Sequence, residues 1–167
     1  MKKINFYAGP SLIHEDVMNE ALELLENNEK LSLLEISHRS DTITKLFDET
    51  RSLVKDLMKL DDNKEILFLH GGASLQFAMI PMNIGTKLTA GFVDTGIWTQ
   101  KAIKEAKKIR HVDVLASGEF DNFNSIPKFK IPDDIGYLHL TSNNTIYGTQ
   151  FNAFPKTDVP CNLKAPT

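Results

Sequence analysis

The chain has 167 residues, 41% hydrophobic and 25% charged, which is the composition of a folded globular protein and not of a disordered one. This length fits a single domain, and a net charge of −3 argues against partners such as nucleic acid or an anionic membrane. One cysteine, Cys161, excludes an intrachain disulfide framework and favours a reducing compartment, so we expect a cytoplasmic protein. The apolar runs are too short to span a membrane, and the N-terminal segment lacks the apolar core of a signal peptide.

The first part of the chain predicts two amphipathic helices. Apolar residues recur at helical spacing from Ser11 to Asn27, and Ser11 is the expected N-cap. A second amphipathic helix is predicted to begin at Asp41 and to end at the turn residues 61–63. We therefore expect an N-terminal helical segment over residues 1–60.

From Lys64 onward, predicted strands and helices alternate. The expected strands cover residues 65–69, 88–93, 112–115 and 137–140, and the expected helices cover 73–83, which Pro81 should end or kink, and 98–109. This order predicts an α/β fold, with helices on a mostly parallel sheet, over residues 61–160. Ligands of such sheets bind outside the carboxyl ends of the strands, here near residues 70–74, 94–98, 117–119 and 141–145.

Two glycines separate the first predicted strand from the helix that follows, in His70-Gly71-Gly72-Ala73-Ser74. The unpaired N–H groups and positive dipole end of a helix start suit a phosphate, and the Ser74 hydroxyl is a further donor. The segment lacks the lysine of a Walker loop and the third glycine of a dinucleotide fingerprint. An ordinary strand-to-helix turn, with Ser74 as a cap, is the alternative interpretation.

Three further groups each have a functional and a structural interpretation. Trp98, the only tryptophan, suits stacking on a flat ring, but a lone tryptophan also suits the core. Arg39, in Ser37-His38-Arg39-Ser40, matches a carboxylate or phosphate, or is a surface residue beside a helix N-cap. The polar run 141–145 suits donation to an anion, or a polar turn.

Six segments that occur in order together resemble phosphoserine aminotransferases. They are Asn5-Phe6-Tyr7-Ala8-Gly9-Pro10, Glu35-Ile36-Ser37-His38-Arg39, His70-Gly71-Gly72-Ala73-Ser74-Leu75-Gln76-Phe77, Asp94-Thr95-Gly96-Ile97-Trp98, Ala102-Ile103-Lys104-Glu105-Ala106-Lys107 and Ser142-Asn143-Asn144-Thr145-Ile146-Tyr147-Gly148. The resemblance runs from about Asn5 to Pro160. It implies a partial large domain of a fold-type-I enzyme that uses pyridoxal 5′-phosphate, in a family whose members are homodimers.

The resemblance assigns four residues to the cofactor. Ala73 and Ser74 would bind its phosphate, Trp98 would stack on its pyridine ring, and Thr145 would hydrogen-bond its phenolic oxygen. Some relatives carry arginine at the position of Ser74, so charge assistance at the phosphate is expected to be weaker here. The resemblance implies no metal site.

The resemblance also implies the reaction and the substrate contacts. The family interconverts O-phosphoserine and 2-oxoglutarate with 3-phosphohydroxypyruvate and glutamate, a step of serine biosynthesis. Relatives in vitamin B6 synthesis suggest 4-phosphohydroxythreonine as a second substrate. Arg39, with His38 beside it, would bind a carboxylate or phosphate of the substrate.

Two motifs that the resemblance implies are absent from the 167 residues. One is a strand-borne aspartate that pairs with the pyridinium nitrogen, and the other is a segment whose lysine forms the Schiff base. Residues 161–167 match nothing in the pattern, and we expect Lys164 to lie in irregular sequence without a strand to hold it. We therefore expect a truncated form that is inactive alone and has no catalytic residue of its own. A non-catalytic fragment that binds pyridoxal phosphate, a phosphate or a partner subunit, a remnant without function, and another aminotransferase of the same fold are the alternatives.

Overall fold

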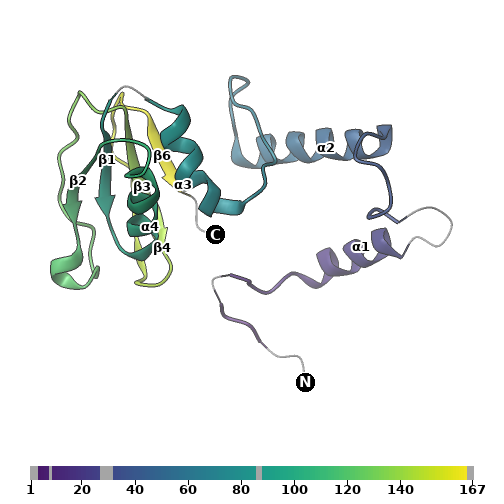
Figure 1. Ribbon diagram of the computed structural model, residues 1–167. Helices are drawn as coiled ribbons and strands as arrows, with labels where there is room; N and C mark the ends of the chain where they lie inside the picture. The colour runs from purple at the N-terminus through teal and green to yellow at the C-terminus, as the bar shows by residue number, and fades with distance from the viewer. Residues whose placement is uncertain (1–3, 8, 27–31, 86–87, 165–167) are drawn as a thin grey trace. The chain divides into compact units, whose positions relative to one another are not determined.

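The computed structural model describes residues 4–7, 9–26, 32–85 and 88–164, which fall into two compact units, Met1–Phe68 and Leu69–Thr167 (Figure 1). Among the described residues, no helix combines the length and the hydropathy that crossing a bilayer requires. The domain boundaries predicted after residues 60 and 160 remain a proposal.

The first unit contains two helices. Helix α1 covers Glu15–Leu25, which is shorter than predicted because His14, and not Ser11, is the N-cap: its Nδ1 accepts the N–H of Asp16 at 3.3 Å. Helix α2 covers Asp41–Met58, as predicted at its start. Ser40 caps α2 through its Oγ, which accepts the N–H of Ile43 at 3.3 Å.

The strand predicted over Glu65–Leu69 is wrong. Residues 64–69 form no strand, and no described segment pairs with them. Their apolar side chains make local contacts instead: the Phe68 ring lies 5.3 Å from the ring of Phe47, and the Arg51 guanidinium lies over both rings. An apolar run gives strand propensity, but a strand also needs a neighbour with free backbone groups.

The second unit is built on a four-stranded sheet with the order β2-β1-β3-β6, in which all neighbours are parallel (Figure 1). The strands are β1 (Ala90–Asp94), β2 (Val112–Ser117), β3 (Tyr137–Thr141) and β6 (Cys161–Lys164). A short antiparallel hairpin, β4 (Asn143–Asn144) with β5 (Thr149–Gln150), follows β3. The prediction of helices on a mostly parallel sheet is therefore confirmed.

Two helices cover one face of this sheet. Helix α3 covers Gly72–Asn83 and helix α4 covers Ile97–Ala106. Their side chains pack on alternate strand residues in one buried cluster, which contains Phe77, Ala90, Phe92, Ala102, Ile103, Ala106 and Tyr137. Pro81 does not end α3. The helix continues beyond the buried Pro81 to Asn83.

The opposite face of the sheet is covered by loops. Val93, Leu138 and Leu140 point to this side because successive strand residues alternate between faces. They pack with Leu115 of β2 and with side chains of the connections between strands, namely Phe129, Ile131, Ile135, Phe151 and Val159. The short helix η1 (Glu119–Asp121) lies in the connection between β2 and β3.

The prediction that Lys164 lies in irregular sequence is also wrong, whereas residues 165–167 lie outside the described residues. Cys161–Lys164 forms β6, which pairs with β3 so that Lys164 is in register with Thr141. The N–H of Leu138 donates to the carbonyl of Pro160 at 2.9 Å, so the pairing begins at the proline itself. Pro160 interrupts the sequence pattern but lies directly before the strand, where its missing N–H is tolerated.

Candidate functional site

Polar residues gather at the carboxyl ends of β1 and β3. After β1 ends at Asp94, the chain turns into α4, and after β3 ends at Thr141, it enters the β4–β5 hairpin. Because β1 and β3 are parallel neighbours, these two connections leave the sheet at the same edge. This is the position at which parallel α/β sheets bind ligands.

The turn between β1 and α4 is held by Asp94, which is 6% exposed. One carboxylate oxygen accepts the N–H of Gly96 at 3.0 Å. The other accepts from Ser117 Oγ at 3.2 Å and from Gln100 Nε2 at 3.4 Å. Asp94 therefore joins the ends of β1 and β2 to the first turn of α4, and its oxygens are occupied by donors within the protein.

Three buried threonines connect α4 to β3. Thr99 Oγ1 lies 2.8 Å from Thr141 Oγ1 and 3.3 Å from Thr95 Oγ1. All three side chains are almost completely buried. This chain of hydroxyl groups was not predicted from the sequence, because Thr95 precedes α4 and Thr141 lies on β3, and no local pattern links them.

Trp98 and Thr145 lie in contact. The indole Nε1–H of Trp98 donates to Thr145 Oγ1 at 3.3 Å, and the Nζ of Lys101 lies 4.5 Å from the centre of the Trp98 rings. Trp98 is partly buried, so it does not lie in the enclosed core that the structural interpretation required. A partly accessible indole suits stacking on a planar group.

The start of α3 carries free backbone donors. Gly71 is the N-cap, with a φ of 85° that favours glycine, and no side chain caps the helix. The interpretation of Ser74 as a cap is therefore wrong. The N–H groups of Gly72, Ala73 and Ser74 have no acceptor within the helix by their position in the first turn.

A cavity of about 270 Å³ lies beside this helix start, lined by Ser74, Phe77, Lys101, Lys104 and Glu105. Glu105 accepts hydrogen bonds from Lys108 at 2.6 and 2.7 Å. Within the part of the chain that the structure describes, Lys101 and Lys104 form no ion pair. The cavity therefore combines helix-start donors with two positive side chains, and Lys101 also joins it to Trp98.

His38 and Arg39 belong to the first unit. They are exposed and lie in the turn before α2, where the Arg39 N–H donates to Ser37 Oγ at 3.3 Å. Arg39 thus does lie on the surface beside the N-cap Ser40. Its role, and that of His38, in binding a substrate anion stays a prediction.

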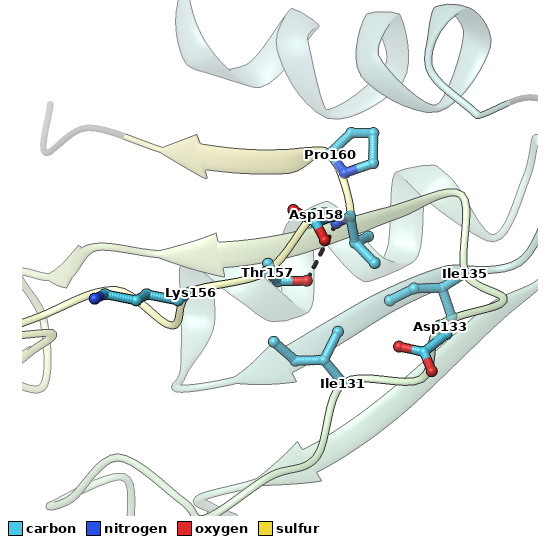
Figure 2. A pocket seen from close by; sticks show the side chains of 8 residues that line it. Ile131, Asp133, Ile135, Lys156, Thr157, Asp158 and Pro160 are labelled. Carbon is cyan, nitrogen blue, oxygen red and sulfur yellow. Dashed lines mark hydrogen bonds between the residues drawn. The ribbon is translucent and has the colours of Figure 1, made fainter.

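A further cavity lies in the second unit. It has a volume of about 580 Å³ and is lined by side chains that precede β3 and β6, among them Asp133, Ile135, Lys156 and Pro160 (Figure 2). Figure 2 also shows the hydrogen bond from the Val159 N–H to Thr157 Oγ1, at 3.1 Å. This cavity is at the amino ends of the strands, whereas ligands of parallel α/β sheets bind at the carboxyl ends, so we do not assign the functional site to it.

A parallel α/β sheet with polar residues at the carboxyl ends of its strands is typical of enzymes that bind small molecules. Comparison of the sequence with models of known protein families identifies the family. The model of the aminotransferase class-V family matches residues 4–158. The chain belongs to the aminotransferase class-V family.

Known proteins of one activity resemble the chain along most of its length. The phosphoserine aminotransferase of Parabacteroides distasonis is 46% identical over 170 residues, which cover 99% of this chain and 48% of that protein. The phosphoserine aminotransferase of Listeria monocytogenes is 45% identical, covering 93% of this chain and 44% of that protein. The chain therefore spans about half the length of the curated relatives it matches.

Solved structures agree with these relatives. The structure of phosphoserine aminotransferase from Bacillus circulans subsp. alkalophilus has a TM-score of 0.88 and 40% identity, over 95% of this chain and 46% of that one. The phosphoserine aminotransferase of Trichomonas vaginalis, whose structure has pyridoxal phosphate bound, has a TM-score of 0.87 and 29% identity, over 97% of this chain and 47% of that one.

Proposed function

We propose that these residues form part of a phosphoserine aminotransferase, which uses pyridoxal 5′-phosphate to interconvert O-phosphoserine and 2-oxoglutarate with 3-phosphohydroxypyruvate and glutamate. Relatives of that name at 41–46% identity support the activity. The observation that carries the proposal is the contact of Trp98 with Thr145 at the carboxyl ends of β1 and β3, together with Lys101, which lies over Trp98 and lines the cavity beside the α3 start.

The residues present fit the phosphate of the cofactor. The first turn of α3 offers three N–H donors, the Ser74 hydroxyl lines the cavity, and its side chain has no other hydrogen bond in the described structure. A phosphate at this place would meet the positive end of the helix dipole. Lys101 and Lys104 line the same cavity and would supply positive charge to the phosphate. Ser74 supplies no such charge, whereas an arginine at its position would.

The residues present also fit the ring of the cofactor. Trp98 offers an indole face, and Thr145 offers a hydroxyl that the indole N–H already orients. Stacking on Trp98 would fix the plane of the ring and exclude water from one side of it. When bound, the cofactor supplies an electron sink for the carbanion formed at the substrate α-carbon.

The remaining parts of the proposal concern substrate and assembly. His38 and Arg39 would bind an anionic group of the substrate, for which the guanidinium offers a planar pair of donors. We include a homodimer, supported by the exposed apolar side chains of the first unit, among them Val17, Leu22, Leu46, Phe47, Leu53 and Leu57. A cytoplasmic location completes the proposal, since the substrates are charged small molecules that do not pass through a bilayer unaided.

Titration of pyridoxal phosphate into wild type and Ser74→Asp tests the proposal, with quenching of Trp98 fluorescence as the signal. A carboxylate about 4 Å from a phosphate repels it by roughly 1–4 kcal/mol, so the affinity should fall by about fivefold or more. Ser52→Asp, which adds the same charge on an exposed position of α2, is the matched control. Pyridoxal without the phosphate should bind Ser74→Asp as it binds wild type. Equal affinity of the two proteins for pyridoxal phosphate contradicts the assignment.

A further inference from the structure

Asn144 is a completely buried amide in a short surface hairpin. It is the last residue of β4, and its side chain leaves the hairpin to reach the turn between β1 and α4. There its Nδ2 donates to the carbonyl of Thr95 at 3.0 Å. A carbonyl can only accept, so this bond fixes the amide with its nitrogen towards Thr95 and its oxygen on the other side.

This one hydrogen bond joins the two segments that carry the Trp98–Thr145 pair. Thr95 directly precedes Gly96, the N-cap of α4, whose second residue is Trp98, and Asn144 lies directly before Thr145. We propose that Asn144 is a positioning residue that sets the distance between the Trp98 indole and the Thr145 hydroxyl. Its relevance to cofactor binding rests on the proposed function, whereas its effect on the Trp98–Thr145 contact does not.

The surroundings of Asn144 leave little freedom for another arrangement. A Cβ on Gly96 would lie 2.6 Å from Asn144 Nδ2, so the turn packs directly against the amide. The hairpin backbone adds a second restraint, because the N–H of Gly148 donates to the Asn144 carbonyl at 2.8 Å. The β1–α4 turn thus restrains the side chain of Asn144, and the hairpin restrains its backbone.

The other half of the amide shows that this position is not optimised for stability alone. Asn144 Oδ1 is buried and has no hydrogen-bond partner among the residues that the structure describes. A buried acceptor without a partner is unfavourable. Leucine, of similar size, would remove that cost but would also remove the donor to Thr95. Asparagine therefore keeps the link to the Trp98 segment at the expense of an unpaired oxygen.

Tryptophan fluorescence gives a direct measure of the proposed role. Trp98 is the only tryptophan of the chain, so the emission and its quenching by acrylamide report on this indole alone. In a ¹⁵N-labelled chain, the single indole N–H resonance reports its hydrogen bond to Thr145. Thr145→Val, which removes the acceptor, defines the shift that loss of this bond produces.

Asn144→Asp, of the same shape but without the donor, and Asn144→Ser, which buries no new charge, are the test variants. In both, without cofactor, we expect a red-shifted emission, stronger acrylamide quenching and an indole resonance moved towards that of Thr145→Val. Asn152→Asp, the same change at an exposed position, should leave all three signals unchanged. Ile135→Ala, at the amino end of the sheet, controls for loss of stability without a change near Trp98.

The outcomes separate the two proposals. Indole signals of the Asn144 variants equal to those of Ile135→Ala at the same folded fraction overturn the positioning role. So does the unfolding of both variants under conditions in which Ile135→Ala stays folded, since Asn144 is then a general structural residue. If wild type binds pyridoxal phosphate, the variants should bind it about 5- to 10-fold more weakly, the effect of one lost hydrogen bond. If wild type does not bind it, the proposed function fails while the cofactor-free signals still decide the role of Asn144.

Discussion

Replacement of Gly96 by alanine should destabilise the protein strongly. Gly96 has a φ of 130° and a ψ of −162°, a region of backbone conformation that only glycine occupies without strain. An added Cβ would lie 2.5 Å from Cδ2 of Tyr147 and 2.6 Å from Nδ2 of Asn144. Backbone strain and steric overlap therefore act together at one position, directly before the helix that carries Trp98.

The magnitude follows from these two contributions. A side chain in this backbone region costs about 1–3 kcal/mol, and an extra methyl group in a tightly packed place costs about a further 1–3 kcal/mol. The Asn144 amide cannot move aside without losing its hydrogen bond to Thr95. We therefore expect Gly96→Ala to lower the free energy of unfolding by about 2–6 kcal/mol, a large part of the 5–15 kcal/mol that is typical of a domain.

Urea unfolding followed by far-ultraviolet circular dichroism measures this change. The matched control is Gly148→Ala, because Gly148 also has a positive φ, of 74°, but nothing lies within 4 Å of its added Cβ. That variant should lose only the backbone term, about 1–2 kcal/mol. If the two variants lose the same stability to within about 0.5 kcal/mol, the contact with Asn144 and Tyr147 carries no energy and the reasoning is refuted.

Two further predictions concern titration and substrate binding. Burial raises the pKa of Tyr137 from 10.0 to about 12, against a smaller lowering by Arg110, so between these pH values the unfolded state loses a proton that the folded state keeps. The contribution of Tyr137 to the free energy of unfolding is complete below pH 10 and falls by about 1.4 kcal/mol per pH unit above it. Tyr137→Phe should therefore remove this part of the pH dependence of the free energy of unfolding, measured with urea at pH 9–11. An unchanged pH dependence would contradict the prediction. In the complete enzyme, Arg39→Lys should raise KM for glutamate or phosphoserine far more than it weakens cofactor binding, because lysine cannot reproduce the paired donors, whereas Arg51→Lys should leave KM unchanged. Wild-type KM values for both substrates in Arg39→Lys would refute the role of Arg39.

The parallel sheet was predictable because its strands have a clear physical signature. β1 and β3 are short runs that are buried along their whole length, as is typical of parallel sheets, whereas β2 at the edge of the sheet is partly exposed. Each of the three is followed by turn or helix signals. The helix from Asp41 was predictable for the same reason, since its apolar residues repeat at helical spacing. These signals are local, so a single sequence contains them in full.

The failures share a different cause. Residues 65–69 have strand character but no partner in the described structure, and Cys161–Lys164 has little strand character but pairs with β3. Whether a segment becomes a strand depends on the neighbouring backbone, which a local pattern does not contain. The hydrogen bonds of the candidate site could not be predicted for the same reason. Thr99 contacts Thr141, and Asn144 contacts Thr95, only in the folded protein.

The chain of 167 residues alone should have no transaminase activity. The reaction needs a lysine that is linked to the cofactor and moves the proton at the substrate α-carbon, together with an acidic partner for the ring nitrogen. Asp94 is buried nearby, but its oxygens are already occupied by Gly96, Ser117 and Gln100. Lys156 lines the cavity at the amino ends of the strands, away from Trp98.

Lys164 is the residue to examine first, because its backbone is in register with Thr141 at the end of the sheet where the site lies. A strand position beside the site still leaves the acidic partner missing, so we expect binding of pyridoxal phosphate without turnover. The purified chain would be incubated with pyridoxal phosphate, treated with borohydride and mapped by mass spectrometry, and phosphoserine-dependent glutamate formation would be measured in parallel. The longer relative from Listeria monocytogenes is the positive control. Glutamate formation by the chain, together with a stable adduct at one defined lysine, would show that the 167 residues already contain the catalytic groups.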